Sequence, residues 1–457
     1  MTGINFAWSA LGGDPALVAR VGTVVREGAL RARLPVRELA RSCVGACALA
    51  AAELGARRGG LAEVPAVRVD DGAVAAAFHS ERLLTVDGRA PVAFAPLSRF
   101  WRTADGWVRT HANYPHHRTR LLDALGLPED ASVEAVAERL AERPAREVEE
   151  TVYRAGGLAI ALRTPEEWAA HEQAAAVAAR PLVERGRLGP ARARVLPPAR
   201  DSSSLLPAAG LRVLDLTRVL AGPVATRTLA LLGAQVLRVD PPHLPELSDQ
   251  HADTGFGKRS ATLDLATDRQ AFEELLAAAD VVVTGYRPGA LDRFGLSPEA
   301  LAERQPGLVV AQVSAWGGYG PWSGRRGFDS LVQVATGIAA VEGSAGRPGA
   351  LPAQALDHGT GYLLAAAVLR ALTEQSYDGG GRVVRLALAR TARWLTDEAA
   401  PEAGGDLPYD GPDAWLAETD SRLGRLRYAR PPVSFAGGPA DWARPPVPWG
   451  TDAARWA

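Results

Sequence analysis

The chain has 457 residues, of which 47% are apolar and 23% are charged, the composition of a globular protein with about two or three domains and large buried cores. Its formal net charge of −1 gives no overall basic field for nucleic acid, and no apolar run approaches the ~20 residues that a membrane span needs. The first turns contain Asp14 and Arg20, where a signal peptide has a basic segment followed by an apolar one. We therefore expect a cytoplasmic protein without nucleic-acid or membrane partners.

The two cysteines, Cys43 and Cys47, stand four residues apart in an alanine-rich helical segment. This arrangement suits neither a disulfide framework nor the two-residue spacing of common zinc motifs. We predict that both cysteines pack in the core and that the chain holds no metal ion.

The first 180 residues carry mostly helical patterns of apolar residues, interrupted by short β-prone runs. We predict helices at 14–30, 36–57, 118–127, 133–144 and 164–186, and strands at 66–71 and 106–112. Residues 181–210 contain arginine, proline and serine without a sustained apolar period. A linker is therefore expected there.

Beyond the linker, apolar strand patterns alternate with helical ones. The predicted strands are 211–217, 235–240, 280–286 and 308–315, and the predicted helices are 223–233, 268–279, 297–305 and 329–340. Such alternation indicates βαβ units. The expected fold class is α/β, with a parallel sheet covered by helices on both faces.

Two alanine-rich segments of the chain resemble each other. Each is a helix followed by a glycine turn and a short β-prone run, one beginning at Gly45 and the other at Gly361. An internal duplication would account for the likeness, and in that register Arg41 stands opposite Asp357, so only one half carries the carboxylate. The alternative is that alanine-rich helices resemble one another in a biased composition.

The turn after the first strand of the second half reads LTRVLAGP and lacks the GxGxxG of dinucleotide folds. NAD or FAD binding is therefore not expected, although a helix N-terminus at this turn favours an anion that Arg218 can reach. Lys258, the one lysine in the chain, is followed by Arg259, a basic pair suited to phosphate. For both places the alternative is an ordinary solvated charge.

Arginines also follow the strand predicted at 280–286. Tyr286 and Arg287 begin an RPG turn, with Arg293 further along, at the end of the sheet where open α/β folds bind ligands. A plain turn without a ligand is the alternative.

The loop 316–327 has five glycines, among them Gly317, Gly318 and Gly320. So many glycines favour a mobile lid or a substrate loop, because they are costly in chain entropy unless backbone must move or approach something closely. The loop ends in two arginines, of which Arg326 is suited either to a phosphate or to solvent.

Asp357 stands where a helix is predicted to begin, near Gly359. Asp is among the best N-cap residues, and a cap stabilises a helix by about 1 kcal/mol, so a structural role is one interpretation. The other is a nucleophile: the helix N-terminus holds the carboxylate ionised, and glycine amides donate to an oxyanion when it attacks a thioester. His358 is a candidate proton donor.

Together, the segments LDLTRVLAGP, GKRSATLDL, YRPGALDRFGL, GFDSLVQVATG and ALDHGTGY resemble the family III CoA-transferases, the CaiB/BaiF family. The likeness covers about residues 205–395, and 430–450 is similar to the family's closing segment. It implies a Rossmann-like large domain and a smaller mixed α+β domain, in two chains that interlock as linked rings. It also implies no permanently bound cofactor, with coenzyme A or acyl-CoA as substrate and a carboxylic acid as acceptor.

The resemblance implies roles for individual residues. Asp357 matches the family's catalytic aspartate, which attacks an acyl-CoA to form an aspartyl-acyl anhydride, recaptures the thiolate as an aspartyl-CoA thioester and passes CoA to the acceptor. The cofactor-binding set is Arg218, Tyr286, Arg293, Phe294 and Arg326, which match positions lining the family's CoA site, with Lys258 and Arg259 of the KRS segment and Arg287 of the RPG turn.

The order of the parts departs from the family pattern, because the small domain precedes the large one. We predict a helical partial second copy of the large-domain region at 1–90, the small domain at 91–180, a linker and return segment at 181–208, and the CoA-binding large domain with its closing segment at 209–457. The two parts can then interlock within one chain as an intramolecular pseudo-dimer. A homodimer is the alternative.

Two other functions stay open. Racemisation of a 2-methylacyl-CoA needs a second acid/base group. In the family's racemases a histidine precedes the aspartate of the GFD-like segment, where this chain has Phe328 before Asp329, although His358 could compensate. The other alternative, motivated by the rearranged order, is a non-catalytic or repurposed CoA-binding protein.

Overall fold

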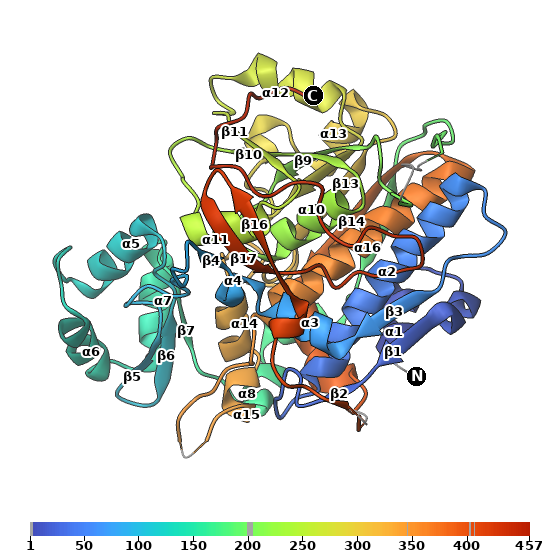
Figure 1. The fold of residues 1–457 in the computed structure, drawn as a ribbon. Coiled ribbons are helices and arrows are strands. Elements are labelled where there is room, and N and C mark those ends of the chain that lie inside the picture. Colours follow the sequence, from blue (N-terminus) through green and yellow to red (C-terminus); the bar gives the residue numbers. More distant parts are fainter. Residues whose placement is uncertain (1–2, 199–203, 345, 402–403, 406) are drawn as a thin grey trace.

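The computed structural model describes residues 3–198, 204–344, 346–401, 404–405 and 407–457 (Figure 1). Residues 199–203 of the predicted linker lie outside the described residues. Within the described part, the largest sheet has seven strands in the order β11-β10-β9-β12-β13-β14-β8. Its pairs are parallel except β14–β8 at one edge, which is antiparallel. The strands are β8 (Glu184–Leu188), β9 (Arg212–Leu216), β10 (Gln235–Asp240), β11 (Arg259–Thr262), β12 (Val281–Thr284), β13 (Val309–Ser314) and β14 (Gly381–Ala387).

Helices cover both faces of this sheet. Successive side chains of a strand point to opposite faces, and in β9 Val213 packs into the core that contains α10 and α16, whereas Leu214 packs into the core under α12 and α13. The helices of this half are α10 (Ala221–Leu231), α11 (Ser248–Thr254), α12 (Arg269–Ala277), α13 (Pro298–Arg304), α14 (Asp329–Ala335), α15 (Ile338–Val341), α16 (Ala355–Asp378) and α17 (Leu388–Arg393), with the shorter η2 (Asp292–Phe294) and η3 (Trp394–Glu398). The predicted α/β class is confirmed.

Two edge strands of this sheet, β8 and β11, are not among the predicted strands. β8 lies inside the segment predicted as a linker, and β11 forms from the GKRSATLDL segment beside β10. Both are edge strands in which polar side chains outnumber apolar ones. Their sequences therefore lack the apolar run that identifies a central strand.

The predicted helix at 14–30 is wrong. Asp14 caps a short 3-10 helix, η1 (Pro15–Arg20), by accepting a 3.0 Å hydrogen bond from the backbone N–H of Ala16. The chain then forms β1 (Val21–Val24), which pairs in parallel with β3 (Val67–Asp70). A strand depends on a partner more than forty residues away, and the local apolar pattern does not reveal that partner.

Two helices of 24 residues form the centre of the molecule. α2 (Val36–Gly59) and α16 lie side by side (Figure 1). α2 is long and apolar enough to cross a membrane by length and composition, but 94% of its apolar window is buried inside the protein, as in a core helix. A Cβ added at Gly359 would lie 3.3 Å from Cys43 Sγ. Cys43 and Cys47 are buried free thiols, which confirms the prediction that they pack in the core.

The surroundings of α2 and α16 are alike. α2 is followed by a strand and a helix, β3 and α3 (Asp71–Phe78), as α16 is followed by β14 and α17. This order agrees with the duplication that the sequence suggests. The remaining elements near the N-terminus are α1 (Gly3–Ala10), β2 (Arg26–Glu27), α4 (Ser80–Leu83) and β4 (Thr85–Val86).

A smaller α+β unit lies apart from the main body, at the left of Figure 1. Its three strands follow the order β5-β6-β7, and it has a separate core around Trp101, Val108 and Leu121. Its elements are β5 (Phe100–Arg102), β6 (Trp107–Thr110), α5 (Pro115–Leu125), α6 (Val133–Ala141), α7 (Ala145–Arg154) and β7 (Ala159–Ala161).

Two short helices follow the small unit. α8 (Pro165–Ala169) and α9 (Glu172–Ala178) replace the single helix predicted at 164–186 and lead from the small unit back to β8.

The last part of the chain returns to the N-terminal region. Near the C-terminus, a hairpin of β16 (Leu416–Ser421) and β17 (Gly424–Ala429) pairs with β4, and β15 (Leu407–Pro408) pairs with β2. Strands from the C-terminal part of the chain thus pair with strands from its N-terminal part.

Candidate active site

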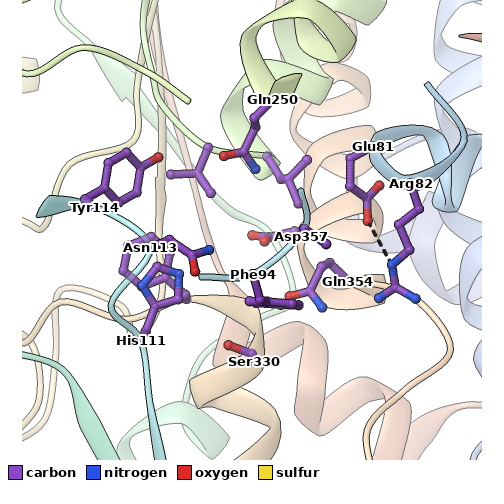
Figure 2. A pocket seen from close by; sticks show the side chains of 14 residues that line it. Glu81, Arg82, Phe94, His111, Asn113, Tyr114, Gln250, Ser330, Gln354 and Asp357 are labelled. Atoms are coloured by element: carbon purple, nitrogen blue, oxygen red, sulfur yellow. Dashed lines mark ion pairs between the residues drawn. The ribbon is translucent and has the colours of Figure 1, made fainter. Parts of the chain in front are cut away.

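A small cavity of about 40 Å³ lies where the three parts of the chain meet, and Asp357 of α16 is in its wall (Figure 2). The N-terminal region contributes residues of α4, the segment before β5 contributes Ala93 and Phe94, the small unit contributes residues that follow β6, and the large half contributes the rest. The cavity is lined by Glu81, Arg82, Ala93, Phe94, His111, Asn113, Tyr114, Val219, Leu220, Gln250, Phe328, Ser330, Gln354 and Asp357.

Asp357 lies in the first turn of α16, which begins at Ala355 and so earlier than predicted. The carboxylate that caps this helix belongs to Asp329, the first residue of α14. Its Oδ2 accepts hydrogen bonds from the backbone N–H groups of Leu356 (2.8 Å) and Asp357 (2.9 Å). Because Asp329 satisfies these donors, the side chain of Asp357 is free of the capping role.

The expectation that the helix N-terminus keeps Asp357 ionised is wrong in direction. Burial raises the pKa of Asp357 well above the ordinary value, and the nearby negative charges of Asp329 and Glu81 raise it further. Burial also raises the pKa of Asp329 to about 6, although its hydrogen bonds from Asp357, Gln333 and Leu356 favour the ionised form. Burial therefore opposes ionisation of both carboxyl groups.

His358 does not line the cavity. Its side chain is fully buried, stacks on the ring of Phe78 at a centroid distance of 5.2 Å, and places Nε2 3.0 Å from Glu81 Oε2. Burial opposes the ionised form of Glu81, but the charge and hydrogen bond of His358 lower the pKa of Glu81 below its ordinary value. His358 therefore positions Glu81 and does not present a proton to the cavity.

Arg218 and the residue after it form the turn between β9 and α10. The Arg218 guanidinium donates to the carbonyls of Leu244 (2.7 Å) and Pro245 (2.9 Å) and lies 3.6 Å from Glu246. Val219 adopts a φ of 71°, a strained conformation for a β-branched residue, and its N–H donates to Glu246 at 3.1 Å. Glu246 thus holds a strained turn in the wall of the cavity.

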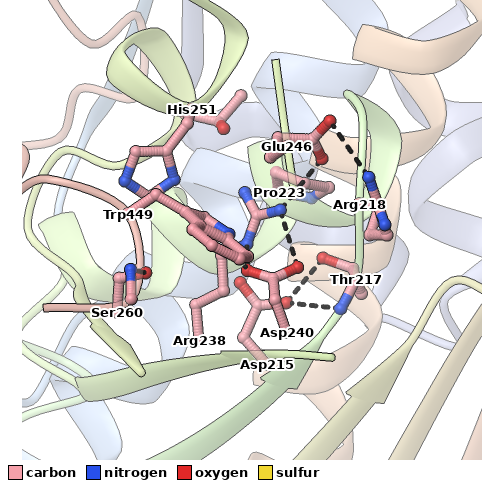
Figure 3. Close-up of polar contacts among 12 residues, drawn as sticks. Asp215, Thr217, Arg218, Pro223, Arg238, Asp240, Glu246, His251, Ser260 and Trp449 are labelled. Atoms are coloured by element: carbon pink, nitrogen blue, oxygen red, sulfur yellow. Dashed lines mark hydrogen bonds and ion pairs between the residues drawn. The ribbon is translucent and has the colours of Figure 1, made fainter. Parts of the chain in front are cut away.

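Glu246 also joins the small unit to the large half. Its Oε1 accepts a hydrogen bond from the hydroxyl of Tyr114, and its Oε2 lies 2.9 Å from the guanidinium of Arg238, part of the buried polar network in Figure 3. Although burial opposes ionisation, the charges of Arg238 and Arg218 lower the pKa of Glu246 to about 2. The carboxylate is therefore ionised at neutral pH and anchors Tyr114 in the cavity wall.

The other predicted CoA-site residues have different surroundings. Tyr286 lies close enough to Arg218 for their charges to interact, and burial raises its pKa to about 12. Arg326 is exposed. Partial desolvation of its side chain, together with the charges of Arg120 and Arg287, lowers its pKa, so three guanidinium groups share one region. Arg293 is exposed and stacks on Phe294 at 4.6 Å.

Lys258 is placed differently from the prediction. Its ammonium group is buried and donates to Asp215 Oδ2 (3.0 Å), to the carbonyl of Pro223 (3.0 Å) and to Thr226 Oγ1 (2.6 Å). All three of its donors are therefore taken by protein groups. The neighbouring Arg259 donates to two carbonyls of the C-terminal segment. The structure does not bring this pair to the cavity of Asp357.

Residues 208–413 match the model of CoA-transferase family III. We call residues 208–413 the family III region, because they are the part of the chain that is similar to this family. The chain is 37% identical over 207 residues to acetyl-coenzyme A transferase nodX of Hypoxylon pulicicidum, a match that covers 43% of this chain and 35% of that protein. It is 34% identical over 193 residues to formyl-CoA:oxalate CoA-transferase of Streptomyces coelicolor, covering 39% and 47% of the two proteins.

Among solved structures, Rv3272 from M. tuberculosis aligns with 42% of this chain and 56% of its own, at 37% identity and a TM-score of 0.40. The chain spans about a third to a half of the length of the curated relatives named above. The match of the family III region ends before β16 and does not include α2 or the small unit.

Hydrogen bonds from Gln173 hold the glycine loop, residues 316–327, in place. The side-chain amide of Gln173 donates to the carbonyls of Trp316 (2.9 Å) and Tyr319 (3.1 Å). A Cβ at Gly320, where φ is 70°, would lie 2.4 Å from Gln173 Oε1, and one at Gly317, where φ is 88°, would meet the ring of Tyr319. Packing and positive φ account for these two glycines, whereas a Cβ at Gly318 would lie 3.9 Å from its nearest neighbour. A mobile lid is therefore not needed to explain them.

Sequence reasoning missed most of the cavity wall. Asp329 had a signal, because an acidic residue opens the helix predicted at 329–340, but its partner α16 starts 26 residues later. Glu81, Phe94 and His111 carried no signal, since they belong to segments that reach Asp357 only through the packing of the N-terminal region and the small unit.

Proposed function

We propose that this protein transfers coenzyme A between an acyl-CoA and a carboxylic acid, with Asp357 as the nucleophile. The observation that carries the proposal is the placement of the Asp357 side chain in a cavity wall while Asp329 takes over the cap of α16. The relatives named above are called transferases of CoA or of acetyl-coenzyme A, which supports the same reaction class.

The reaction proceeds through covalent intermediates on Asp357. A carboxylate oxygen attacks the thioester carbonyl, the C–S bond breaks, and CoA leaves as a thiolate from the resulting aspartyl-acyl anhydride. The thiolate then attacks the aspartyl carbonyl carbon, so that the donor acid departs and an aspartyl-CoA thioester forms. The acceptor carboxylate repeats these two steps in reverse order, which yields the new acyl-CoA and restores Asp357.

The surroundings of Asp357 suit these intermediates. Asn113, Gln250 and Gln354 place amide groups around the cavity (Figure 2), where they can donate to oxygens that gain charge during attack. The side chain of Asp357 is only 6% exposed, so water has little access to the anhydride. A carboxylate whose pKa is raised is also more basic, and therefore more nucleophilic, once it has lost its proton.

A trapping experiment tests the nucleophile. The protein is incubated with a panel of short-chain acyl-CoA donors, treated with hydroxylamine and digested, and the peptide that contains Asp357 is weighed by mass spectrometry. We expect a hydroxamate on Asp357 in the wild type and none in Asp357→Asn. A hydroxylamine-sensitive adduct that persists in Asp357→Asn would place the nucleophile on another residue.

Asp329→Asn is expected to shift the acidic limb of the pH profile of kcat/KM to lower pH. The substitution removes one of the charges that raise the pKa of Asp357, while the amide oxygen still accepts from Leu356 and Asp357. Asp357 then ionises at lower pH, and activity persists further into acid. The control is Asp378→Asn at the other end of α16, which should leave the profile in place; an unmoved profile in Asp329→Asn would contradict the coupling.

We place the phosphates of CoA against the guanidinium groups near Arg326. Arg326→Gln is expected to raise KM for acyl-CoA by about 10-fold or more with little change in kcat, because a charge-assisted hydrogen bond contributes about 1.5–3 kcal/mol. Arg425→Gln, on the exposed β16–β17 hairpin, is the matched control. Equal KM values for the two variants in initial-rate kinetics would remove Arg326 from the CoA site.

A single chain completes the site in this proposal. Glu81 from α4, Phe94 from the segment before β5 and His111 from the small unit all line the cavity of Asp357, as expected of an intramolecular pseudo-dimer. Activity should then stay proportional to protein concentration, even over a range in which light scattering shows that oligomers dissociate into single chains. A specific activity that falls with dilution would favour a homodimeric site.

The racemase alternative is separable by isotope exchange. It needs a second acid/base group, and the histidine in the cavity wall is His111, which stacks on Phe328 at a centroid distance of 3.7 Å. Burial and Arg109 lower the pKa of His111 to about 3, which leaves it neutral and weakly basic at pH 7. Deuterium uptake from heavy water at the α-carbon of a 2-methylacyl-CoA would support racemisation, and none is expected.

A further inference from the structure

His111, the residue after β6, has a buried side chain without a polar partner. The residue is 4% exposed, and its backbone N–H donates to the carbonyl of Leu158 at 3.1 Å, next to the pairing of β6 with β7. Its Nδ1 is buried without a hydrogen-bond partner, and no hydrogen bond joins the imidazole to another of the described residues. Because most buried polar side chains make such a bond, this imidazole calls for a partner in the cavity.

Aromatic neighbours hold the ring of His111 in one orientation. It stacks on Phe328 with a centroid distance of 3.7 Å and an angle of 2° between the rings, and the ring of His117 lies T-shaped to it at 5.9 Å. Phe328 is followed by Asp329, which accepts the backbone N–H of Asp357. The stack therefore fixes the imidazole of the small unit relative to the residue that we propose as the nucleophile.

The imidazole and the carboxyl group of Asp357 share one small cavity. Both residues are in its wall (Figure 2), and its volume is about 40 Å³, whereas a single water molecule needs about 10–15 Å³. The cavity therefore has room for only a few small groups. A carbonyl group that enters it and contacts Asp357 also comes within reach of the other walls, among them His111.

His111 is a neutral hydrogen-bond donor at pH 7. Burial, and after it the charge of Arg109, lower the pKa of His111 to about 3, against a smaller opposing contribution from its own backbone. A neutral imidazole carries one N–H. It can donate a hydrogen bond without transferring a proton, which suits an oxygen that gains negative charge in one step and loses it in the next.

We propose that the imidazole N–H of His111 donates a hydrogen bond to the thioester oxygen as Asp357 attacks, which makes His111 a further catalytic residue. This inference rests on the proposed function and adds a group to it. A carboxylate oxygen of Asp357 bonds to the carbonyl carbon, and the electron pair of the C=O double bond moves to the oxygen, where His111 stabilises the charge. The pair returns as the C–S bond breaks and CoA leaves as a thiolate. His111 keeps its proton throughout.

The test removes the N–H and keeps the ring. In His111→Phe we expect kcat, measured with the most active donor of a short-chain acyl-CoA panel, to fall about 100-fold or more, the usual cost of one lost oxyanion donor. KM should stay within about threefold of the wild-type value. The Tm should not fall, because the imidazole has no hydrogen bond to another described residue to lose. His111→Gln, which restores an N–H donor, should regain part of kcat.

His117→Phe is the matched control. His117 is also a buried histidine with an unpartnered Nδ1, and its ring touches the same cluster, but it does not line the cavity of Asp357. Its substitution by phenylalanine should leave kcat unchanged. A loss of kcat in His117→Phe as large as that in His111→Phe would assign both effects to packing of the ring cluster and overturn the catalytic role.

The outcomes also separate this inference from the proposed function. Transfer by the wild type with an unchanged kcat in His111→Phe, or a loss that comes with a lower Tm and that His111→Gln does not reduce, overturns the role of His111 and leaves the function standing. Should no transfer be seen, the carbonyl stretch of isotope-labelled acetyl-CoA bound to Asp357→Asn is measured by infrared difference spectroscopy. A stretch that moves to higher frequency when His111→Phe is added supports the hydrogen bond, and an equal stretch or absent binding overturns it.

Discussion

Asp357→Asn is expected to abolish CoA transfer and, at the same time, to raise the melting temperature at neutral pH. The loss of transfer should be about 10⁴-fold or more, as for other enzymes that lose a covalent nucleophile. The gain in stability follows from the carboxyl group itself. In the folded protein its pKa is raised well above the ordinary value by burial and by Asp329 and Glu81, whereas in the unfolded chain it ionises near pH 4.

The sign of the effect follows from the two pKa values. Below the unfolded pKa the group is protonated in both states and has no effect on the pH dependence of folding. As the pH rises above that value, ionisation of Asp357 lowers the free energy of the unfolded chain. The folded protein must either keep the proton or bury a charge. The free energy of unfolding therefore falls. Asparagine does not titrate. The variant should therefore be more stable than the wild type at pH 7 to 8, and this advantage should vanish near pH 4.

The measurement is thermal unfolding at pH 4 and pH 7.5, with Tm rising by about 2 °C for each kcal/mol recovered. Asp378→Asn, in the last residue of the same helix, is the matched control. Asp378 is exposed. Although desolvation opposes ionisation, Arg382 and Arg187 lower the pKa of Asp378, so its substitution should not stabilise the protein at pH 7.5. A Tm of Asp357→Asn at or below the wild-type value at pH 7.5 would contradict the raised pKa of Asp357 in the folded protein.

The second half of the fold could be predicted because its signals are local. The strands β9, β10, β12 and β13 are short apolar runs, and one predicted helix follows each of them before the next predicted strand, so period and order suffice to indicate a parallel sheet. In the first half, local patterns also predicted the helix at 36–57 and the strands at 66–71 and 106–112, which the structure confirms as α2, β3 and β6, but other elements lack a local signal. Val21–Val24 forms a strand only because Val67–Asp70 lies beside it, and the local sequence contains no trace of that pairing.

In the candidate site, too, one feature could be predicted from local sequence and another depends on tertiary packing. Asp357 could be found because it stands in a motif at a helix start, but its environment was predicted with the wrong sign. The sequence places a carboxylate at a helix N-terminus, and the physical expectation is a lowered pKa. In the folded protein Asp329 receives the N–H donors, and burial then decides the pKa of Asp357. Which of two carboxylates caps a helix depends on tertiary packing that spacing alone does not determine.

Lys258→Met is expected to destabilise the protein by about 3–5 kcal/mol, the usual cost of removing one partner of a buried ion pair. A solitary lysine among arginines suggested a phosphate ligand, but a compact ammonium is also the group that can donate to three acceptors in a closed space. Lys258 is 2% exposed, and its pair with Asp215 is fully buried. Burial lowers the pKa of Lys258 to about 8, so the ion pair is intact at pH 7.

Loss of Lys258 leaves Asp215 with its bonds from Thr217 and Thr226 but without the ammonium at 3.0 Å. Lys258→Met combined with Asp215→Asn should therefore recover part of the lost stability in urea unfolding, because no uncompensated charge remains. Arg259→Gln is the neighbouring control, with an expected loss of about 1 kcal/mol or less for a partly exposed residue. At temperatures where Lys258→Met stays folded, KM for acyl-CoA should equal that of the wild type. A raised KM with unchanged stability would instead support Lys258 as a ligand of a CoA phosphate. A phosphate ligand contributes to substrate binding, whereas a buried ion pair contributes to folding.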